Sequence, residues 1–262
     1  MSNNIKENRI KEKKAAKLMA EKQQDAKLYR LMLQFAFVVV AVVLAIKAGN
    51  NPLPTIEYVM PPYLLVTGVL FALSAVFFTY RKRKNVDESS KVLTGAFIFG
   101  NLTSLFAAGV AFYIYWDAEL VIAALITFTV LYFAHNIYGG NFFAYSLLTA
   151  VGFLALRVAK AEPHIFYLIG LIGVIAAYVL MVAVPLVAIA LGILLISKNK
   201  NYTIFGITIG GKKCAVTFFI CAAAVIAGAV LMLFSLAPTV LADFLLLGSY
   251  LVIAVICTVK MI

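Results

Sequence analysis

The stretch from His164 to Ile196, HIFYLIGLIGVIAAYVLMVAVPLVAIALGILLI, decides the fold because it contains no Asp, Glu, Lys or Arg. Its hydrophobicity is continuous and does not alternate, which predicts a helix rather than a half-buried strand. At 1.5 Å per residue this helix is about 50 Å long, well beyond the roughly 30 Å hydrocarbon core of a bilayer. One tilted helix with a kink at Pro185, or two short spans that meet there, would account for the excess length.

The rest of the chain has the same apolar character. Of its 262 residues, 64% are hydrophobic and 13% are charged, and the mean hydropathy is +1.02. Soluble domains carry about 25% charged residues, so this composition excludes a soluble globular protein. Further runs long enough to span a bilayer are 31–48, 62–80, 92–116, 118–138, 142–158, 214–236 and 239–259. Backbone polar groups in hydrocarbon must pair within the protein, so these runs are expected to be helices. The sequence predicts an all-α polytopic integral membrane protein, a bundle of about eight transmembrane helices in four hairpins.

The distribution of basic residues predicts the orientation of the bundle. Lys and Arg accumulate in the short cytoplasmic loops of membrane proteins. With eight spans and a cytoplasmic N-terminus, the outer side holds only Lys47, Arg157 and Lys160 of the 22 basic residues. Splitting the 164–196 run would move the basic loop 198–213 to the outer side and weaken this contrast. We therefore expect one span at 164–196 and both termini on the cytoplasmic side of a plasma membrane.

The chain divides by charge into a basic arm over 1–30 and a transmembrane helical domain over 31–262. Residues 5–30 are rich in Ala, Lys, Glu and Gln and contain no Pro or Gly, which predicts a helical arm. As a topology signal, the arm would lie against anionic lipid head groups, at about 1 kcal/mol per basic residue. As a docking arm, it would bind an acidic cytosolic protein. Nucleic acid is not the expected partner, because aromatic residues do not interleave with the basic ones.

Charged residues are almost absent from the predicted membrane interior, where they usually mark functional sites. The exception is Asp243, about one turn inside the outer end of the 239–259 run. At this depth it could form an outer-face ion pair with Arg157, or belong to an outward-facing binding site. The interior lacks a midplane carboxylate, which argues against a proton-coupled or sodium-coupled carrier. Transport of a neutral or amphiphilic solute stays open.

The loop HNIYGGN, residues 135–141, is the most unusual short segment. It is a compact turn whose Asn136 and Asn141 cap two helix ends, or an inner-mouth ligand site formed with His135. The predicted topology puts His135 and His164 at opposite membrane faces, so no shared metal site is expected. The sequence contains no H-E-x-x-H and no G-x-S-x-G motif. We therefore expect no catalytic residue, no metal and no cofactor, and no enzymatic activity.

A second short motif, Gly206 to Lys213, fits G-x-x-x-x-G-K but lacks the following Ser or Thr that binds magnesium. A phosphate-binding loop is therefore rejected. The alternating residues 202–209, YTIFGITI, instead predict a short strand-like loop between two spans.

One amide, Asn101, lies near mid-membrane beside a ridge of small residues formed by Gly100, Ser104 and Ala108. Small residues spaced by four allow helix backbones to approach closely in lipid. An unpaired amide there is costly, so Asn101 is expected to hydrogen-bond across helices or to face a pore or ligand.

Two functions remain compatible with the sequence. In the first, the chain is a non-enzymatic subunit or scaffold of a membrane complex, with a basic cytoplasmic docking arm. In the second, it is a permease or channel component for a neutral or amphiphilic solute, with Pro185 and Asn101 as parts of the path. The lack of interior charge favours the first.

Overall fold

The computed structural model describes residues 2–84, 91–138, 140–164, 167–198, 202–204, 207–209, 212–233 and 246–255. Almost all of these residues are helical, because the continuous apolar runs leave helix as the way to pair the backbone. Seven described helices are long and apolar enough to cross a membrane: Lys14–Asn50, Pro52–Arg83, Gly95–Tyr115, Ala118–Ile137, Gly140–Lys160, Tyr167–Ser197 and Ala215–Met232. This is the predicted architecture of an all-α polytopic membrane bundle. The total of eight spans and the side of each terminus stay predictions.

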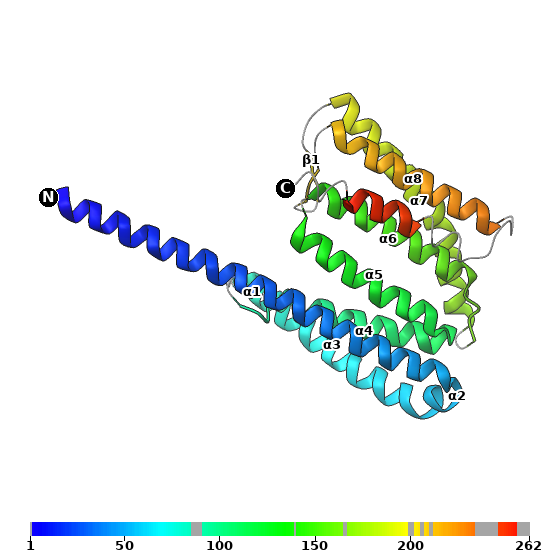
Figure 1. The fold of residues 1–262 in the computed structure, drawn as a ribbon. Helices are drawn as coiled ribbons and strands as arrows, with labels where there is room; N and C mark the ends of the chain where they lie inside the picture. The colour runs from blue at the N-terminus through cyan, green and yellow to red at the C-terminus, as the bar shows by residue number, and fades with distance from the viewer. Residues whose placement is uncertain are drawn as a thin grey trace. The chain divides into compact units, whose positions relative to one another are not determined.

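The elements follow the apolar runs closely (Figure 1). In chain order they are α1 (Ser2–Asn50), α2 (Pro52–Pro54), the π-helical η1 (Thr55–Val59), α3 (Met60–Arg83), α4 (Gly95–Tyr115), α5 (Ala118–Ile137), α6 (Gly140–Lys160), α7 (Tyr167–Lys198), β1 (Tyr202–Ile204), β2 (Ile207–Ile209) and α8 (Lys212–Leu233). Of the predicted span 239–259, the structure describes the apolar helix Leu246–Val255, called the 246–255 helix below. It is the red helix of Figure 1.

The long apolar run 164–196 contributes one continuous helix, α7, rather than two. α7 passes through Pro185 without a break, although this residue has no N–H to donate to the preceding turn. It begins at Tyr167 and has 32 residues, so at 1.5 Å per residue it is about 48 Å long. The kink predicted at Pro185 stays a prediction.

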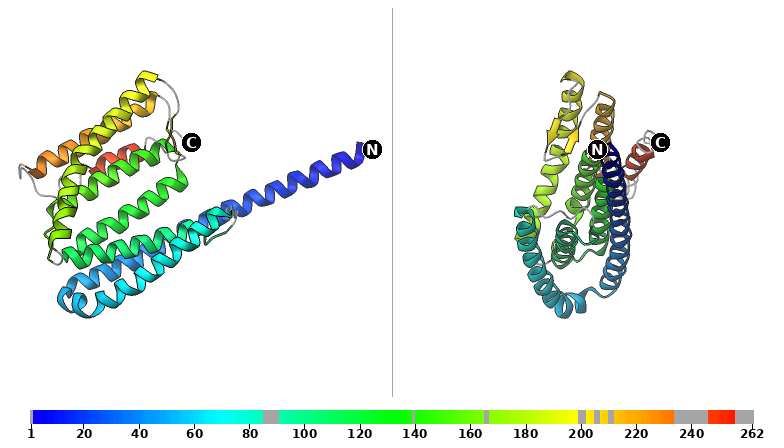
Figure 2. Two further views of the ribbon diagram at one scale, coloured as in Figure 1. Left: turned by 180° about the vertical axis from the view of Figure 1, so that it is seen from behind. Right: turned by 90° about the vertical axis from the view of Figure 1, so that its left-hand side faces the viewer.

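The chain forms two compact units, Met1–Val110 and Ala111–Ile262. In the first unit, the predicted basic arm and the first apolar run lie on the single helix α1, which Figure 2 shows without interruption. From Ala26 onward α1 buries one stripe at helical spacing, formed by Ala26, Gln34, Val38, Ala41 and Ala45. The predicted division at residue 30 therefore falls within a continuous helix, and its functional meaning stays a prediction.

In the first unit, α3 and α4 pack through aromatic rings. The Phe71 ring stacks on those of Phe99 and Phe106, with centroids 5.7 and 5.6 Å away. The Phe78 ring stacks on Phe99 at 5.4 Å. The Tyr63 hydroxyl donates to the carbonyl of Leu105 at 2.9 Å, which closes one end of this contact.

The second unit is centred on α6, which contacts α5, α7 and α8. Figure 1 shows α6 between α5 and the α7–α8 pair. Small residues make the close approach possible: a Cβ added at Gly152 would lie 2.7 Å from a methyl carbon of Val225 on α8. Likewise, a Cβ added at Gly192 of α7 would lie 2.8 Å from the ring of Phe219. Both contacts follow the small-residue rule for helices in lipid.

The alternating segment 202–209 forms the strand-like loop that its pattern predicts. β1 and β2 pair in antiparallel register, with Tyr202 opposite Ile209 and Ile204 opposite Ile207. This hairpin connects α7 to α8.

Candidate functional site

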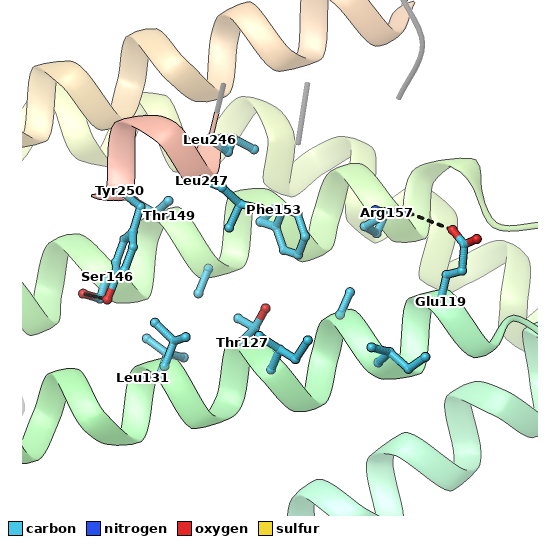
Figure 3. A pocket seen from close by; sticks show the side chains of 15 residues that line it. Glu119, Thr127, Leu131, Ser146, Thr149, Phe153, Arg157, Leu246, Leu247 and Tyr250 are labelled. Carbon is cyan, nitrogen blue, oxygen red and sulfur yellow. Dashed lines mark hydrogen bonds and ion pairs between the residues drawn. The ribbon is translucent and has the colours of Figure 1, made fainter. Parts of the chain in front are cut away.

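A groove in the second unit is the best candidate for a binding site. It lies between α5, α6 and the 246–255 helix and has a volume of about 370 Å³, within the range of small-molecule sites. Its lining comes from these three helices: Glu119, Ile122, Ala123, Ile126, Thr127, Val130, Leu131, Ser146, Thr149, Ala150, Phe153, Arg157, Leu246, Leu247 and Tyr250. We call it the α5–α6 groove (Figure 3).

The middle of the α5–α6 groove is apolar and open on one side. Its floor is α6, where Thr149 and Ala150 are buried. Its rims are half-exposed apolar side chains, Ile126 on α5 at 48% exposure and Leu247 on the 246–255 helix at 49%. Because α5 and α6 are of membrane-spanning length and the 246–255 helix is apolar, the surroundings of these rims are expected to be lipid chains.

One end of the α5–α6 groove carries two opposite charges. Nη1 of Arg157 lies 3.4 Å from Oε2 of Glu119, and Figure 3 shows this ion pair at one end of the row of lining side chains. The Arg157 side chain is 27% exposed and that of Glu119 is 82% exposed. Asp117 fixes the start of α5 by accepting from the backbone N–H groups of Glu119 and Leu120 at 2.8 and 3.1 Å. Asp117 is thus the N-cap of α5, a position where Asp is favoured.

The other end of the α5–α6 groove carries hydroxyl groups. The Ser146 hydroxyl donates to the carbonyl of Phe142 at 2.8 Å and lies 3.2 Å from the Tyr250 hydroxyl. Thr149 donates back to the carbonyl of Tyr145 at 3.0 Å, with its oxygen also 3.5 Å from the sulfur of the buried Cys221. These hydroxyls therefore have partners within the protein.

Among the sequence-predicted site residues that the structure describes, Arg157 alone lines the α5–α6 groove. Its predicted partner Asp243 lies outside the described residues. The acidic partner that the structure gives Arg157 is Glu119, which the sequence patterns did not select.

The polar residues of the predicted loop 135–141 make separate contacts. His135 is exposed, and its ring meets the edge of the Phe143 ring at 5.0 Å. The Asn136 side chain donates to the carbonyl of Tyr132 at 2.8 Å, one turn back in its own helix. Asn141 is half-buried in the first turn of α6 and also has an interaction partner. A role of these three residues as an inner-mouth site stays a prediction.

Asn101 is 8% exposed and belongs to the first unit, whereas the α5–α6 groove lies within the second. Its amide nitrogen donates to the carbonyl of Phe97 at 2.9 Å, within α4 itself rather than across helices. Its Oδ1 has no hydrogen-bond partner among the described residues. Half of this amide is thus satisfied locally, which lowers the cost of its burial.

The sequence patterns do not single out three polar residues that are conspicuous in the structure, Gln34, Ser146 and Thr149. Gln34, on the buried stripe of α1, is fully buried, and neither atom of its amide group has a partner among the described residues. Ser146 and Thr149 line the α5–α6 groove, but serine and threonine in an apolar helix most often bond to their own backbone. Gln34 could have been recognised from the sequence, because it is the one polar residue within the stretch 31–46.

His164 follows α6 in the chain, and its backbone N–H donates to the carbonyl of Ile114 near the end of α4 at 2.8 Å. Its ring is tilted against that of Trp116 at 5.0 Å. Trp116 has a φ of 56°, an uncommon conformation for a bulky residue. Among the described residues, no group of three His, Cys, Asp or Glu side chains could hold a metal ion.

Comparison of the chain with protein-family models, curated proteins and solved structures found no match.

Proposed function

We propose that this protein is a non-enzymatic subunit or scaffold of a membrane complex, and that the basic arm on α1 docks an acidic protein surface. The observation that carries the proposal is a change of environment along one helix. Every residue from Lys14 to Asp25 is exposed, whereas the stripe from Ala26 to Ala45 is buried.

The arm offers a surface that mixes charge with apolar side chains. Lys14, Lys17 and Lys22 are exposed, together with Leu18 at 54% and Met19 at 59%. Apolar side chains within a basic helix can add buried contact area once electrostatic attraction has brought an acidic partner close. The continuous helix would also hold the docked partner at a fixed distance from the membrane.

A site-specific photocrosslinker tests this docking role. With the probe at Leu18, we expect a discrete protein adduct in cells, lost when Lys14, Lys17 and Lys22 are all replaced by Gln. A probe at Val43, 58% exposed in the apolar part of the same helix, is the matched control and should be insensitive to that triple substitution. Adducts of the Leu18 probe with lipid alone, or adducts unaffected by the triple substitution, would contradict the proposal.

The proposed orientation has its own test. Single cysteines placed between residues 198 and 213 should react with a membrane-impermeant reagent from the cytoplasmic side of a plasma membrane. Labelling from the outer side alone would overturn the eight-span topology. It would also remove the basis for a cytoplasmic N-terminal arm.

The α5–α6 groove favours a second candidate, a permease or channel component for an amphiphilic solute. A groove that is apolar in its middle and charged at one end can hold a molecule that has both characters. In proteoliposomes, this candidate requires flux or exchange of an amphiphile that falls when the groove is filled by Ala123→Phe. The docking proposal requires no such flux.

A further inference from the structure

We propose that the α5–α6 groove binds one phospholipid with a phosphoethanolamine head group, whose phosphate lies at Arg157, whose ammonium lies at Glu119, and one of whose acyl chains fills the groove. This inference concerns the second unit and goes beyond the docking role of the arm.

The depth of the charged pair matches that of a lipid head group. Glu119 is in the first turn of α5, and Arg157 is in the last turn of α6. Both helices are of spanning length, so these turns lie where hydrocarbon gives way to the polar interface. The stem of Arg157 passes near Phe153, with the guanidinium carbon 5.9 Å from the ring centroid, so the side chain covers apolar surface while its charge points to the interface.

The length of the α5–α6 groove matches one acyl chain. Its lining on α5 runs from Glu119 to Leu131, which is about 18 Å at 1.5 Å per residue. One leaflet contributes about half of a hydrocarbon core of roughly 30 Å. The groove therefore reaches from the interface to about the end of one leaflet, and its half-exposed rims, Ile126 and Leu247, leave it accessible from the lipid.

The charges at the groove end favour a zwitterionic head group. Arg157 and Glu119 together are neutral, so a head group with one negative and one positive charge complements both. A guanidinium forms strong paired hydrogen bonds to phosphate oxygens. A primary ammonium has N–H groups to donate to Glu119, whereas a quaternary ammonium has none. An anionic head group without an amine would meet repulsion from the Glu119 carboxylate.

The cost of opening the existing ion pair is small. The two atoms are 3.4 Å apart and Glu119 is 82% exposed, so water or a head group can replace either partner easily. At the far end, the hydroxyls of Ser146 and Tyr250 lie within hydrogen-bonding distance of each other. A lipid chain that reaches them therefore does not have to leave buried polar groups unsatisfied.

Native mass spectrometry of the delipidated full chain tests the assignment. The probes are phosphatidylethanolamine, phosphatidylcholine and phosphatidylglycerol with identical palmitoyl and oleoyl chains. We expect phosphatidylethanolamine to be retained best. Arg157→Gln should weaken its retention about tenfold, because a charge-assisted hydrogen bond is lost. Glu119→Gln should weaken it up to about fivefold and remove the preference over phosphatidylcholine.

Matched variants keep the test specific. Lys160→Gln and Glu162→Gln remove exposed charges near the same end of α6 but outside the groove lining, and should leave retention unchanged. Ala123→Phe fills the groove and should weaken retention of all three lipids. The elution profile and melting temperature of each variant check its fold.

Three results would overturn the proposal. Equal retention of the three lipids, unchanged by Arg157→Gln, would show that Arg157 and Glu119 do not bind a lipid head group. Preferential retention of phosphatidylglycerol, strengthened by Glu119→Gln, would show that the groove binds an anionic lipid and not a zwitterionic one. Unchanged retention in a folded Ala123→Phe variant would place the bound lipid outside the groove.

Discussion

α6 packs against α7 and α8 along one face and borders the α5–α6 groove along another, and small residues line both. Gly152 faces Val225 of α8 so closely that a Cβ there would come within 2.7 Å of a methyl carbon. Ala150, two residues earlier, lines the groove together with Ala123 of α5. The same kind of residue therefore closes one interface and leaves the other open.

The difference lies in what each small residue faces. At Gly152 a branched side chain from the neighbouring helix fills the space, as expected for helix packing in lipid. At the groove the floor and one rim contribute small residues, Ala150 of α6 and Ala123 of α5, and the lining side chains leave a volume of about 370 Å³ between them. A stripe of small residues thus allows close packing but does not ensure it.

The largest expected effect is at the face of α6 that packs against α8. Gly152→Ala should destabilise the protein by about 1–3 kcal/mol, because the added methyl overlaps Val225 and the packed helices must separate. Thermal unfolding in detergent measures this loss. Val225→Ala in the same chain should restore part of it, and strictly additive effects of the two substitutions would contradict a direct contact.

The next effect concerns the start of α5, which forms one wall of the groove and carries Glu119. Asp117→Ala removes the cap that accepts from two backbone N–H groups and should cost about 1 kcal/mol. Asp117→Asn keeps a capping oxygen and is the matched control. Equal melting temperatures for the alanine variant and the wild type would show that the cap does not stabilise the start of α5.

A smaller effect is expected at the hydroxyl end of the groove. Ser146→Ala removes the 3.2 Å contact with Tyr250 and should cost about 0.6 kcal/mol, the average for hydrogen bonds between membrane helices. Tyr250→Phe should cost about the same, and the double variant should add little. Fully additive losses would mean that the two hydroxyls do not act as a pair.

The smallest effect separates the two faces most clearly. Ala150→Leu should cost less stability than Gly152→Ala, because its new methyl groups enter the groove and do not meet a packed side chain. Because Ala150 is itself buried, the informative quantity is the comparison: its melting temperature should fall less than that of Gly152→Ala, whose added methyl meets Val225 directly. A loss as large as that of Gly152→Ala would show that the groove is closed in the folded protein.

Much of the fold could be predicted because hydrophobic run length reports on helices directly. The seven long apolar helices and the 202–209 hairpin agree with the sequence patterns. α7 as one helix through Pro185 also agrees, since one span at 164–196 fits the basic residues better than two.

The candidate site was harder to predict because sequence indicates the depth of a residue in the membrane but not the direction in which it faces. Depth suggested Asp243 as the partner of Arg157, whereas the structure pairs Arg157 with Glu119. The local hydrogen bond of Asn101 likewise depends on a side-chain rotamer rather than on its position along the helix. The groove itself depends on how α5, α6 and the 246–255 helix turn toward one another.

Photolabelling with a phosphatidylethanolamine that carries a diazirine on one acyl chain tests the open face of α6 most directly. In bilayers of the full chain, we expect adducts to concentrate on α5 from Ile122 to Leu131 and on α6 from Ser146 to Phe153, and to fall in Ala123→Phe. The exposed apolar faces of α3 and α7, for example at Leu73 (61% exposed) and Val182 (62%), serve as internal controls for general lipid contact. Adducts spread evenly over those faces and the groove, with no response to Ala123→Phe, would contradict a lipid-binding groove.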